Sequence, residues 1–476
     1  MSEKRNISTM AVLLAAGQGK RMKSSLPKVL HEVLGKPIVK RVLNALDGIC
    51  LDHIYIIVGH QADDVRAFLE KEPPATSFST HLQEPQLGTG HALMQVEPAL
   101  GEVESTLLVM PADTPLIATE TLHSFLDRHR KNKAQLSVLG TKVADPKNYG
   151  RLVRDQHGQV VKIVEDKDAS DQEREITEVN TGIFCLEWPL CRAGLLSLGN
   201  ENRQQEYYLT DLLGWAIAQG HSVASEVLLD WREAHGINSR IELAEANRLL
   251  NEKVMTTLAL QHGVTVIDPQ STWIAPEAVI GQDTIVCPGS FVMGNVEIGS
   301  ACVIGPHTTL MGPVQIGDRT SVIQSLVSNS RVGADCRVGP FAHLRDGVEI
   351  MDHARMGNFV EIKNSTVGAH TNVSHLSYVG DASLGDNVNI GAGTITANYN
   401  HITKVKSRTV IGDGASTGSN SVLVAPVVIG QESTVAAGTV VTKDVPEGAL
   451  AVARVRQENK IAWTAKKLSK NAKEKA

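Results

Sequence analysis

The chain has few aromatic residues, no excess of positive charge and no long apolar run. Aromatic side chains make up 4% of its 476 residues, which suits a core of thin, closely stacked layers filled by aliphatic side chains. The formal net charge of −6 argues against a nucleic-acid-binding protein, because such proteins carry basic surfaces. No segment approaches the ~20 apolar residues of a membrane-spanning helix, so we expect no membrane as a partner.

The sequence also lacks paired cysteine motifs. Its six cysteines are scattered without a C-x-x-C pair, which in a long chain indicates free thiols in a reducing compartment. The N-terminus imitates a signal peptide, because basic residues precede a short apolar run. However, Gln-Gly-Lys-Arg-Met-Lys follows where a cleavage site should lie. We therefore expect a cytoplasmic protein in which residues 10–16 form a buried first strand.

The composition is that of a folded protein with more than one domain. It is 42% hydrophobic and 21% charged, and 476 residues are too many for a single core. In the first half, apolar runs of strand length alternate with helical segments. The expected strands are 10–16, 53–58, 106–110, 135–140 and 182–186, and the expected helices include 37–46 and 119–132. This alternation predicts an open, mostly parallel sheet with helices on both faces, and ligands beyond the carboxyl ends of its strands.

The second half follows a six-residue repeat. An aliphatic residue and then a glycine recur at Ile280-Gly281, Ile298-Gly299, Ile316-Gly317, Val379-Gly380 and Ile390-Gly391. This period predicts a parallel β-helix in which the aliphatic residues fill a narrow prism and the glycines form tight corners. Three strands per turn would make each coil three hexads long. The repeat lapses between about 396 and 409, where we expect a protruding loop.

These patterns divide the chain into four parts. The fold class is α/β plus all-β, with a nucleotide-handling domain over 1–240 and a β-helix over 263–453. Apolar residues at helical spacing predict a linker helix over 241–262. The basic tail, 454–476, fits a solvated and partly disordered chain end better than a nucleic-acid-binding arm.

A glycine loop with cations follows the first strand. In LAAGQGKRMKSSLPK (14–28), backbone N–H groups at Gly17 and Gly19 could approach a triphosphate, while Arg21 and Lys28 offset its charge. The string is neither a Walker A loop nor G-x-G-x-x-G. A surface loop with solvated cations fits the spacing equally well.

Longer motifs settle the choice by resemblance. The string L-A-A-G-x-G-x-R-M…L-P-K resembles the sugar-phosphate nucleotidyltransferases. The likeness continues through QEPQLGTGHA (83–92), ADTPL (112–116), NYGR (148–151), EDKDA (165–169), EVNTGI (178–183), EYYLTD (206–211) and GINSR (236–240). With the hexads behind them, these motifs resemble the members of that family that also carry a hexapeptide-repeat acyltransferase.

The resemblance implies a Rossmann-like head and a left-handed β-helix that assembles as a homotrimer. It also implies two reactions of bacterial cell-wall precursor synthesis. Glucosamine 1-phosphate is acetylated from acetyl-CoA, and N-acetylglucosamine 1-phosphate then reacts with UTP and magnesium to give UDP-N-acetylglucosamine and pyrophosphate.

In the head, the resemblance implies that Arg21 and Lys28 stabilise phosphate charge and that Asp113 and Asn238 bind magnesium. Among the nucleotide contacts, Gln83, Gln86, Gly88 and Thr89 would frame the uracil, and Gly150, Glu165 and Asn180 would bind the sugar. The remaining implied UTP or UDP-sugar contacts are Leu14, Ala15, Ala16, Gly17, Lys28 and Asn238.

In the β-helix, the resemblance makes His375 the general base, since an imidazole titrates in the range needed to accept a proton from an attacking amine. The implied glucosamine 1-phosphate contacts are Arg345, Lys363, Tyr378 and Asn389. The implied acetyl-CoA contacts are Ala392, Asn398, Tyr399, Ser419, Ala437 and Arg454. The chain departs from the family pattern at Ala112, where glycine is common, at Ala397, and at Asn400-His401.

Three alternatives remain at this point. The chain could be a single-activity sugar-1-phosphate nucleotidyltransferase whose β-helix is regulatory or oligomerising. It could be a scaffold without enzymatic activity. Finally, His307, His343, His353 and His370 raise the idea of a zinc site in the prism, although their spacing matches no defined ligand pattern.

Overall fold

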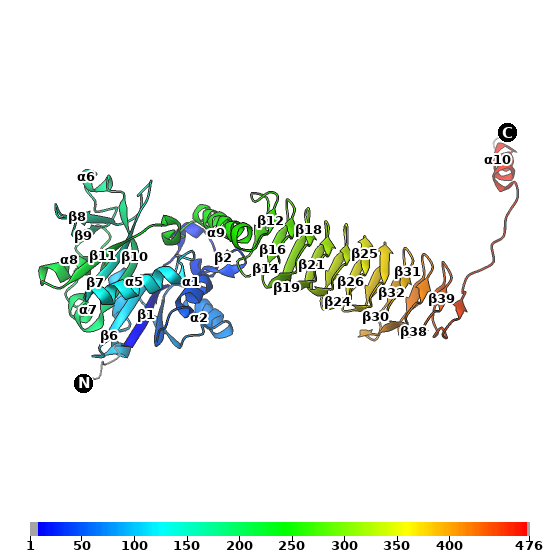
Figure 1. Ribbon diagram of the computed structural model, residues 1–476, viewed down its shortest axis with the longest axis horizontal. Helices are drawn as coiled ribbons and strands as arrows, with labels where there is room; N and C mark the ends of the chain where they lie inside the picture. Colours follow the sequence, from blue (N-terminus) through cyan, green and yellow to red (C-terminus); the bar gives the residue numbers. More distant parts are fainter. Residues whose placement is uncertain (1–7, 474–476) are drawn as a thin grey trace. The chain divides into compact units, whose positions relative to one another are not determined.

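The computed structural model describes residues 8–473, with side chains described up to Lys470. Residues 1–7 and 474–476, which include the first part of the signal-like stretch and the end of the basic tail, lie outside the described residues. The chain separates into two compact units, one ending at Asn251 and one beginning at Glu252 (Figure 1). We call them the head and the prism.

The head is built on one twisted sheet in the order β11-β7-β10-β6-β1-β4-β5. Its strands are β1 (Ser8–Leu14), β4 (His53–Val58), β5 (Phe78–Leu82), β6 (Ser105–Pro111), β7 (Leu136–Lys142), β10 (Glu178–Glu187) and β11 (Val223–Leu228). The pairs of β1 with β4 and β6, of β4 with β5 and of β7 with β11 are parallel, whereas β10 is antiparallel to both neighbours. The mostly parallel sheet expected from the sequence is therefore confirmed.

Helices cover both faces of this sheet. Because successive strand residues face opposite sides, Leu13 of β1 packs in one core cluster and Val12 in another. The first cluster includes buried residues of α1 (Ile38–Asp47), α2 (Ala62–Lys71) and α5 (Thr119–Asn132). The second includes those of α3 (Thr89–Met94), α4 (Glu97–Leu100), α7 (Trp188–Leu195) and α8 (Asp211–Ala218). A hairpin, β8 (Arg151–Arg154) and β9 (Val160–Val164), extends from β10.

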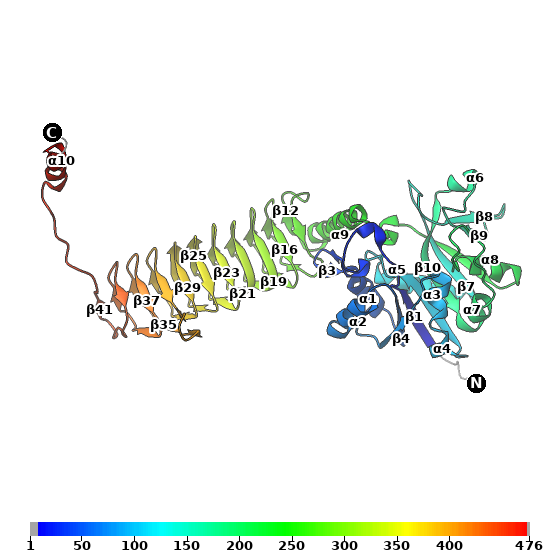
Figure 2. The same cartoon turned by 180° about the vertical axis from the view of Figure 1, so that it is seen from behind.

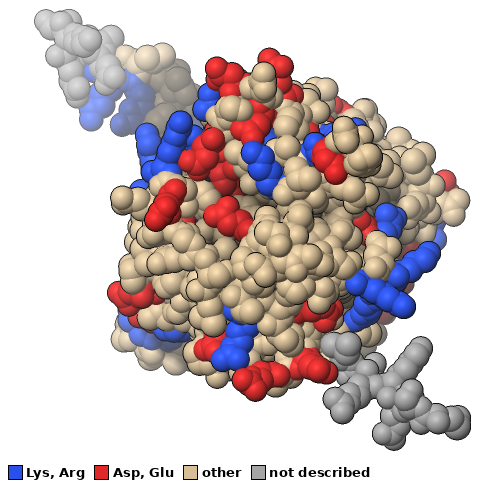
Figure 3. All heavy atoms as spheres, turned by 90° about the vertical axis from the view of Figure 1, so that its left-hand side faces the viewer, with Lys and Arg blue, Asp and Glu red and all other residues tan. Residues whose placement is uncertain are grey.

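The head surface mixes charges of both signs. In the view onto the left-hand end of Figure 1, acidic and basic side chains are interspersed (Figure 3). Among the described helices, none combines the length and apolar character that a membrane crossing requires.

Helix α9 (Arg240–Gln261) contains the boundary between the two units. Ala246 and Leu249 belong to a core cluster of the head, whereas Met255 and Leu258 belong to the core of the prism. The linker helix expected over 241–262 thus corresponds to α9. Its first half buries residues in the head, and its second half buries residues in the prism.

The prism is a parallel β-helix, seen from both sides in Figures 1 and 2. One face is an 11-stranded sheet from β12 (Thr265–Val266) to β41 (Leu450–Ala451). The other two faces form a 17-stranded sheet from β13 (Trp273–Ile274) to β40 (Val440–Val441). They are joined because β19 (Thr309–Ile316) and β21 (Leu326–Val332) each pair on both faces. Val303 lies opposite Ser321, three hexads later, as the repeat predicts.

Aliphatic side chains fill the prism as expected. On the first face Val286, Ile304, Val322 and Val338 stack in register and are all buried. Each buried residue therefore contacts its equivalents in neighbouring coils, and the core is a continuous column rather than a globular centre.

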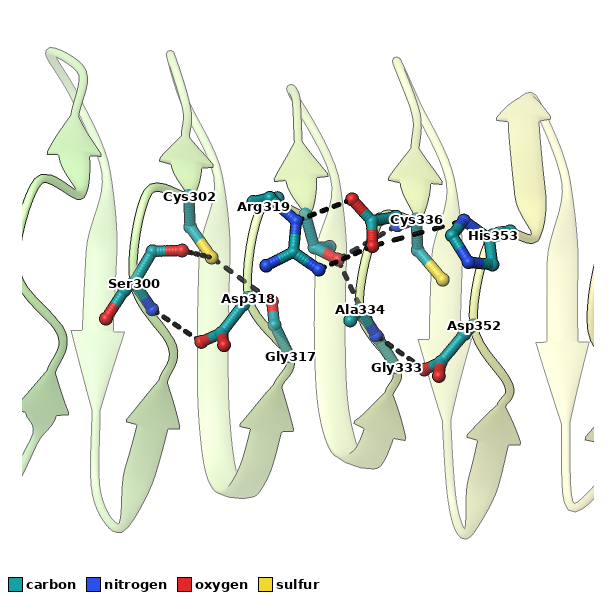
Figure 4. A network of polar contacts seen from close by, with 12 residues as sticks. Ser300, Cys302, Gly317, Asp318, Arg319, Gly333, Ala334, Cys336, Asp352 and His353 are labelled. Carbon is teal, nitrogen blue, oxygen red and sulfur yellow. Dashed lines mark hydrogen bonds and ion pairs between the residues drawn. The ribbon is translucent and has the colours of Figure 1, made fainter.

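Gly305 and Gly339 of the repeat adopt positive φ (+98° and +97°), as the expected corner role requires, but other glycines of the repeat have a different role. Gly299 and Gly333 do not adopt positive φ; instead, an added Cβ on either would lie 2.3 Å from Oδ1 of Asp318 or Asp352 in the next coil. These carboxylates accept hydrogen bonds of 2.8 Å from the N–H groups of Ser300 and Ala334 (Figure 4). Many of the left-handed corner positions are taken by residues other than glycine, among them Arg319 and His353. The repeat glycine thus permits close stacking of coils.

Two segments interrupt the regular pattern. The lapse expected between 396 and 409 is an antiparallel hairpin of β33 (Tyr399–Asn400) and β34 (Val405–Lys406). In the tail, expected to be solvated and partly disordered, the described side chains from 454 to 470 are exposed and a helix, α10 (Trp463–Lys473), is present. Its lysines, leucine and alanines all favour helix.

Candidate active sites

The first candidate site lies where the carboxyl ends of β1, β4 and β6 meet. The N–H of Ala15 donates to the carbonyl of Ile57 (2.8 Å), and the N–H of Ala112 donates to the carbonyl of Leu14 (3.0 Å). These bonds continue the sheet ladders into the loop that begins at Ala16. An added Cβ on Gly17 would meet nothing within 4 Å, so this loop backbone is open to an approaching ligand.

Lys28 is the centre of this site. Its Nζ lies 2.5 Å from Oδ2 of Asp113 and 3.0 Å from Oδ1 of Asn238, and the Lys28 and Asp113 side chains are only 10% and 19% exposed. Gly19 adopts φ +57°, and an added Cβ there would lie 2.8 Å from Cβ of Lys28. The fold therefore brings together three residues selected from the sequence. Arg21 lies exposed on the adjoining 3-10 helix η1 (Lys20–Met22).

Two residues that the sequence did not indicate support this cluster. Glu242 of α9 accepts hydrogen bonds from the N–H of Asn238 (2.7 Å) and the hydroxyl of Ser239 (3.0 Å), which fixes the loop that carries Asn238. Tyr149 is half-buried nearby, and its partial burial raises the pKa of its hydroxyl. The NYGR motif contained Tyr149, but the motif alone assigned it no role.

The four residues expected to frame a base lie around one loop. Gln83 donates through Nε2 to the carbonyl of Gly88 (2.9 Å), and Gln86 donates to the carbonyl of Gln83 (3.1 Å). Gly88 adopts φ +99°, and an added Cβ would lie 2.7 Å from the carbonyl oxygen of Tyr207, so glycine is required there. Thr89 accepts a hydrogen bond at Oγ1 from the N–H of Leu209 (3.1 Å).

The three residues expected to bind the sugar also meet. The N–H of Asn180 on β10 donates to the carbonyl of Gly150 (2.7 Å). An added Cβ on Gly150 would lie 3.4 Å from Oε1 of Glu165, so this carboxyl group is beside the same backbone. Burial raises the pKa of Glu165, and a hydrogen bond from the Thr210 hydroxyl (3.0 Å) partly opposes that shift.

The second candidate site follows one corner of the prism. His375, at the end of β28 (Asn372–His375), is exposed, and its Nδ1 lies 3.0 Å from Oδ1 of Asn358 in the preceding coil. In later coils Ala392, Ser419 and Ala437 occupy the same corner. Backbone hydrogen bonds connect this column from coil to coil: the N–H of Gly393 donates to the carbonyl of His375 (3.4 Å), that of Asn420 to Ala392 (2.7 Å) and that of Gly438 to Ser419 (2.8 Å). At its end, Nη1 of Arg454 donates to the carbonyl of Ala437 (2.7 Å).

The expected phosphate-binding cations stack on an adjacent face. Arg345 of β23 (His343–Arg345) lies in register with Lys363 of β26 (Glu361–Lys363). Arg345 donates through Nη2 (2.7 Å) and Nε (2.9 Å) to Oε1 of Glu361, which raises the pKa of its guanidinium. Lys363 Nζ lies 3.4 Å from Oδ2 of Asp346. Both cations are therefore held on carboxylates of their own chain.

Two further expected residues, Tyr378 and Asn398, lie beside Arg345 and Lys363. The other two, Asn389 and Tyr399, lie elsewhere on the prism. An added Cβ on Gly380, the register partner of Lys363, would lie 2.3 Å from the Tyr378 hydroxyl. Asn398 Nδ2 lies 3.5 Å from the same hydroxyl. Asn389 is exposed on β31 (Asn389–Ile390), on the face that carries His375, and Tyr399 is exposed on the hairpin.

The histidines considered for zinc do not form a metal site. His353 and His370 stack with ring centroids 4.7 Å apart, and His353 Nδ1 lies 4.0 Å from Asp335. Within residues 8–473, the structure holds no group of three His, Cys, Asp or Glu side chains placed to share a metal ion.

Family models match residues in both the head and the prism. Residues 11–172 match the model of the MobA-like NTP transferase domain, and residues 277–312, 329–364 and 408–443 match that of the bacterial transferase hexapeptide (six repeats). The chain is similar to proteins described as bifunctional protein GlmU. That of Halalkalibacterium halodurans is 45% identical over 96% of this chain and 98% of the relative. Those of Geobacillus thermodenitrificans and Pelobacter propionicus are 46% and 42% identical over 95% of this chain and 97% of the relative.

Proposed function

The chain belongs to the family of the bifunctional protein GlmU, and we propose on that basis how its own residues carry out the two reactions of the family. It is a bifunctional transferase that acetylates glucosamine 1-phosphate and transfers a uridylyl group to N-acetylglucosamine 1-phosphate in UDP-N-acetylglucosamine synthesis. The relatives match across both units, which favours two activities over a single-activity enzyme with a regulatory β-helix.

We place uridylyl transfer at the Lys28 cluster. The sugar phosphate is already a nucleophile, so the protein need only position the reactants and offset charge at the phosphates. Lys28 and Arg21 supply positive charge there, and the loop at Ala16 and Gly17 supplies backbone N–H groups. Gln83, Gln86, Gly88 and Thr89 hold the base, and Gly150, Glu165 and Asn180 hold the sugar.

Magnesium is the proposed cofactor of this site. The Asp113 carboxylate and the Asn238 carbonyl already converge on one cationic group, the Lys28 ammonium. Hard oxygen ligands of this kind suit Mg²⁺. Asp113 and Asn238 would hold such an ion, whose charge would offset that of the phosphates. The chain's own part is to present Asp113 and Asn238 on a loop that Glu242 fixes.

We place acetyl transfer at the His375 corner. Since Asn358 Oδ1 can only accept a hydrogen bond, it assigns the proton to Nδ1 of His375 and leaves Nε2 free to take a proton from the amine. Arg345, Lys363, Tyr378 and Asn389 would hold glucosamine 1-phosphate. The corner column of Ala392, Ser419, Ala437 and Arg454, with Asn398 and Tyr399, would hold acetyl-CoA. This column is the observation that supports the placement most strongly.

We also propose a cytoplasmic homotrimer. Exposed apolar side chains line the corner at His375, both in its own coil and in the preceding coils. Phe341, Phe359 and Leu376 are 51%, 57% and 61% exposed. An apolar ridge beside a catalytic residue is what a subunit interface next to the active site would cover. All six cysteines are unpaired, as a reducing compartment would keep them.

A coupled assay tests the proposal. Purified protein is supplied with glucosamine 1-phosphate, acetyl-CoA, UTP and magnesium, and each component is left out in turn. We expect UDP-N-acetylglucosamine and pyrophosphate only in the complete mixture. Without UTP we expect N-acetylglucosamine 1-phosphate to accumulate. Product formation without acetyl-CoA would contradict the assignment of the prism.

A further inference from the structure

Asp381 is a buried carboxylate between the proposed substrate-binding residues of the prism. It occupies a corner with φ +50° and is 8% exposed. Its oxygens accept hydrogen bonds from two side-chain amides, one in the preceding coil and one in the following coil. Oδ1 accepts from Asn364 Nδ2 (2.6 Å), and Oδ2 accepts from Asn398 Nδ2.

The neighbours of this carboxylate link it to the proposed acetyl-transfer site. The N–H of Asp381 donates to the carbonyl of Lys363 (3.0 Å), and Asn364 is the next residue after that lysine. Asn398 lies at the base of the hairpin, where its carbonyl accepts from the N–H of Ser407 (2.8 Å), and its Nδ2 lies 3.5 Å from the Tyr378 hydroxyl. Asp381 thus contacts the segments that carry three proposed binding residues.

We propose that Asp381 is a positioning residue for acetyl transfer, which fixes the orientation of the Asn398 amide and, through it, the Tyr378 hydroxyl. This inference rests on the proposed location of the acetyl-transfer site. An ionised carboxylate only accepts hydrogen bonds, so both neighbouring amides must turn their NH₂ groups toward it. Each amide then directs its carbonyl oxygen away. Asn398 is held as an acceptor for an N–H group of a ligand, either the amine of the sugar or an amide of the acetyl donor.

Replacing this carboxylate with an amide reverses that constraint. In Asp381→Asn, the new side chain has one acceptor and one donor end, so one of the two neighbouring amides must flip. Asparagine tolerates left-handed backbone conformations, so the corner itself should persist. Losing a hydrogen bond to a charged group corresponds to a ~10- to 100-fold fall in kcat/KM of acetyl transfer. We expect uridylyl transfer by the same molecules to stay within about twofold of wild type.

Two further variants separate positioning from stability. Asp352→Ala removes another inter-coil carboxylate bond, to the N–H of Ala334, at a corner outside the proposed site. It should lower the melting temperature without lowering acetyl transfer. Asn398→Ala completes a double-mutant cycle with Asp381→Asn. If Asp381 acts through Asn398, the double variant should be no slower than Asn398→Ala alone. The KM that changes identifies which substrate the amide contacts.

Several results would overturn the inference. Acetyl transfer by Asp381→Asn within about twofold of wild type would exclude a positioning role, as would a fully additive double-mutant cycle or an inert Asn398→Ala. His375→Ala is run beside these variants. If His375→Ala keeps full acetyl transfer, the proposed site is wrong and the inference falls with it. If His375→Ala is inactive while Asp381→Asn is not impaired, only the inference fails.

Discussion

The Nζ atom of Lys28 lies 2.5 Å from Oδ2 of Asp113, so the proposed phosphate-binding cation is paired with the proposed metal ligand. The prism repeats this arrangement, with Arg345 on Glu361 and Lys363 beside Asp346. Lys28 in the head and both Arg345 and Lys363 in the prism are thus held on carboxylates of the same chain. Such pairing keeps the cations ordered and lowers the cost of burying them until an anionic ligand competes for them.

The Lys28–Asp113 pair predicts competition between Lys28 and a divalent cation. In Lys28→Ala the Asp113 carboxylate loses its partner, so the protein without nucleotide should bind Mn²⁺ several-fold more tightly than wild type. Manganese serves as a spin-active substitute for magnesium, and electron paramagnetic resonance measures its free fraction. Uridylyl transfer should fall sharply in the same variant, because the triphosphate loses a cation.

Lys20→Ala is the control for this measurement. Lys20 is an exposed lysine on the same loop, and its removal changes the net charge equally. Mn²⁺ binding should be unchanged in that variant. Equal or weaker Mn²⁺ binding by Lys28→Ala would show that the lysine does not compete for the carboxylate.

The two activities should be lost separately. Asp113→Ala removes a proposed magnesium ligand in the head and should abolish uridylyl transfer while acetyl transfer stays near wild type. His375→Ala removes the proposed base and should lower acetyl transfer by ~10²- to 10⁴-fold, the usual contribution of general base catalysis. Each reaction is measured alone, with pyrophosphate release for one and free thiol formation for the other. A folded variant that loses both reactions would contradict independent sites.

Much of the architecture could be predicted because it depends on local pattern. The alternation of strands and helices gave the head sheet, and the hexads gave the coils, since an inward aliphatic residue is needed at every turn. The partners of the site residues depend on register instead. Asn358 and His375, like Asn364, Asp381 and Asn398, are spaced one coil apart. A search for polar residues at that spacing would have indicated Asn358 and Asp381.

The motifs indicated Lys28, Asp113 and Asn238 by resemblance, but no spacing in the sequence indicated that the three side chains meet. Asp113 and Asn238 lie on loops that follow different elements of the head, and only the folded sheet brings them to one lysine. Tyr149 and Glu242 were missed for the same reason. Ala112, where the resemblance leads us to expect glycine, is accommodated because its N–H bonds to the carbonyl of Leu14 and its methyl group is buried.

Gly380 should be essential for the position of Tyr378. An added Cβ at Gly380 would lie 2.3 Å from the Tyr378 hydroxyl, and the far end of that side chain can move to avoid it. Gly380→Ala should therefore cost little stability but displace the hydroxyl, raising the KM for glucosamine 1-phosphate about tenfold, the loss of one hydrogen bond. Steady-state kinetics with each substrate varied in turn measures this. Tyr378→Phe should reproduce the effect, and a normal KM in both variants would remove Tyr378 from the binding site.

The raised pKa of Glu165 predicts that the difference in stability between Glu165→Gln and wild type depends on pH. Burial favours the neutral carboxyl group in the folded state, so the folded protein holds this proton more tightly than the unfolded chain does. Stability contributed by the proton is present below the unfolded pKa, near 4.5, and is lost as pH rises through the folded pKa. Glu165→Gln is neutral at every pH and can still accept the hydrogen bond from Thr210. It should therefore melt at a higher temperature than wild type at pH 8, and the difference should shrink toward pH 4.5. Scanning calorimetry of both proteins across this range measures the difference, and a gap that does not vary with pH would show that Glu165 titrates normally.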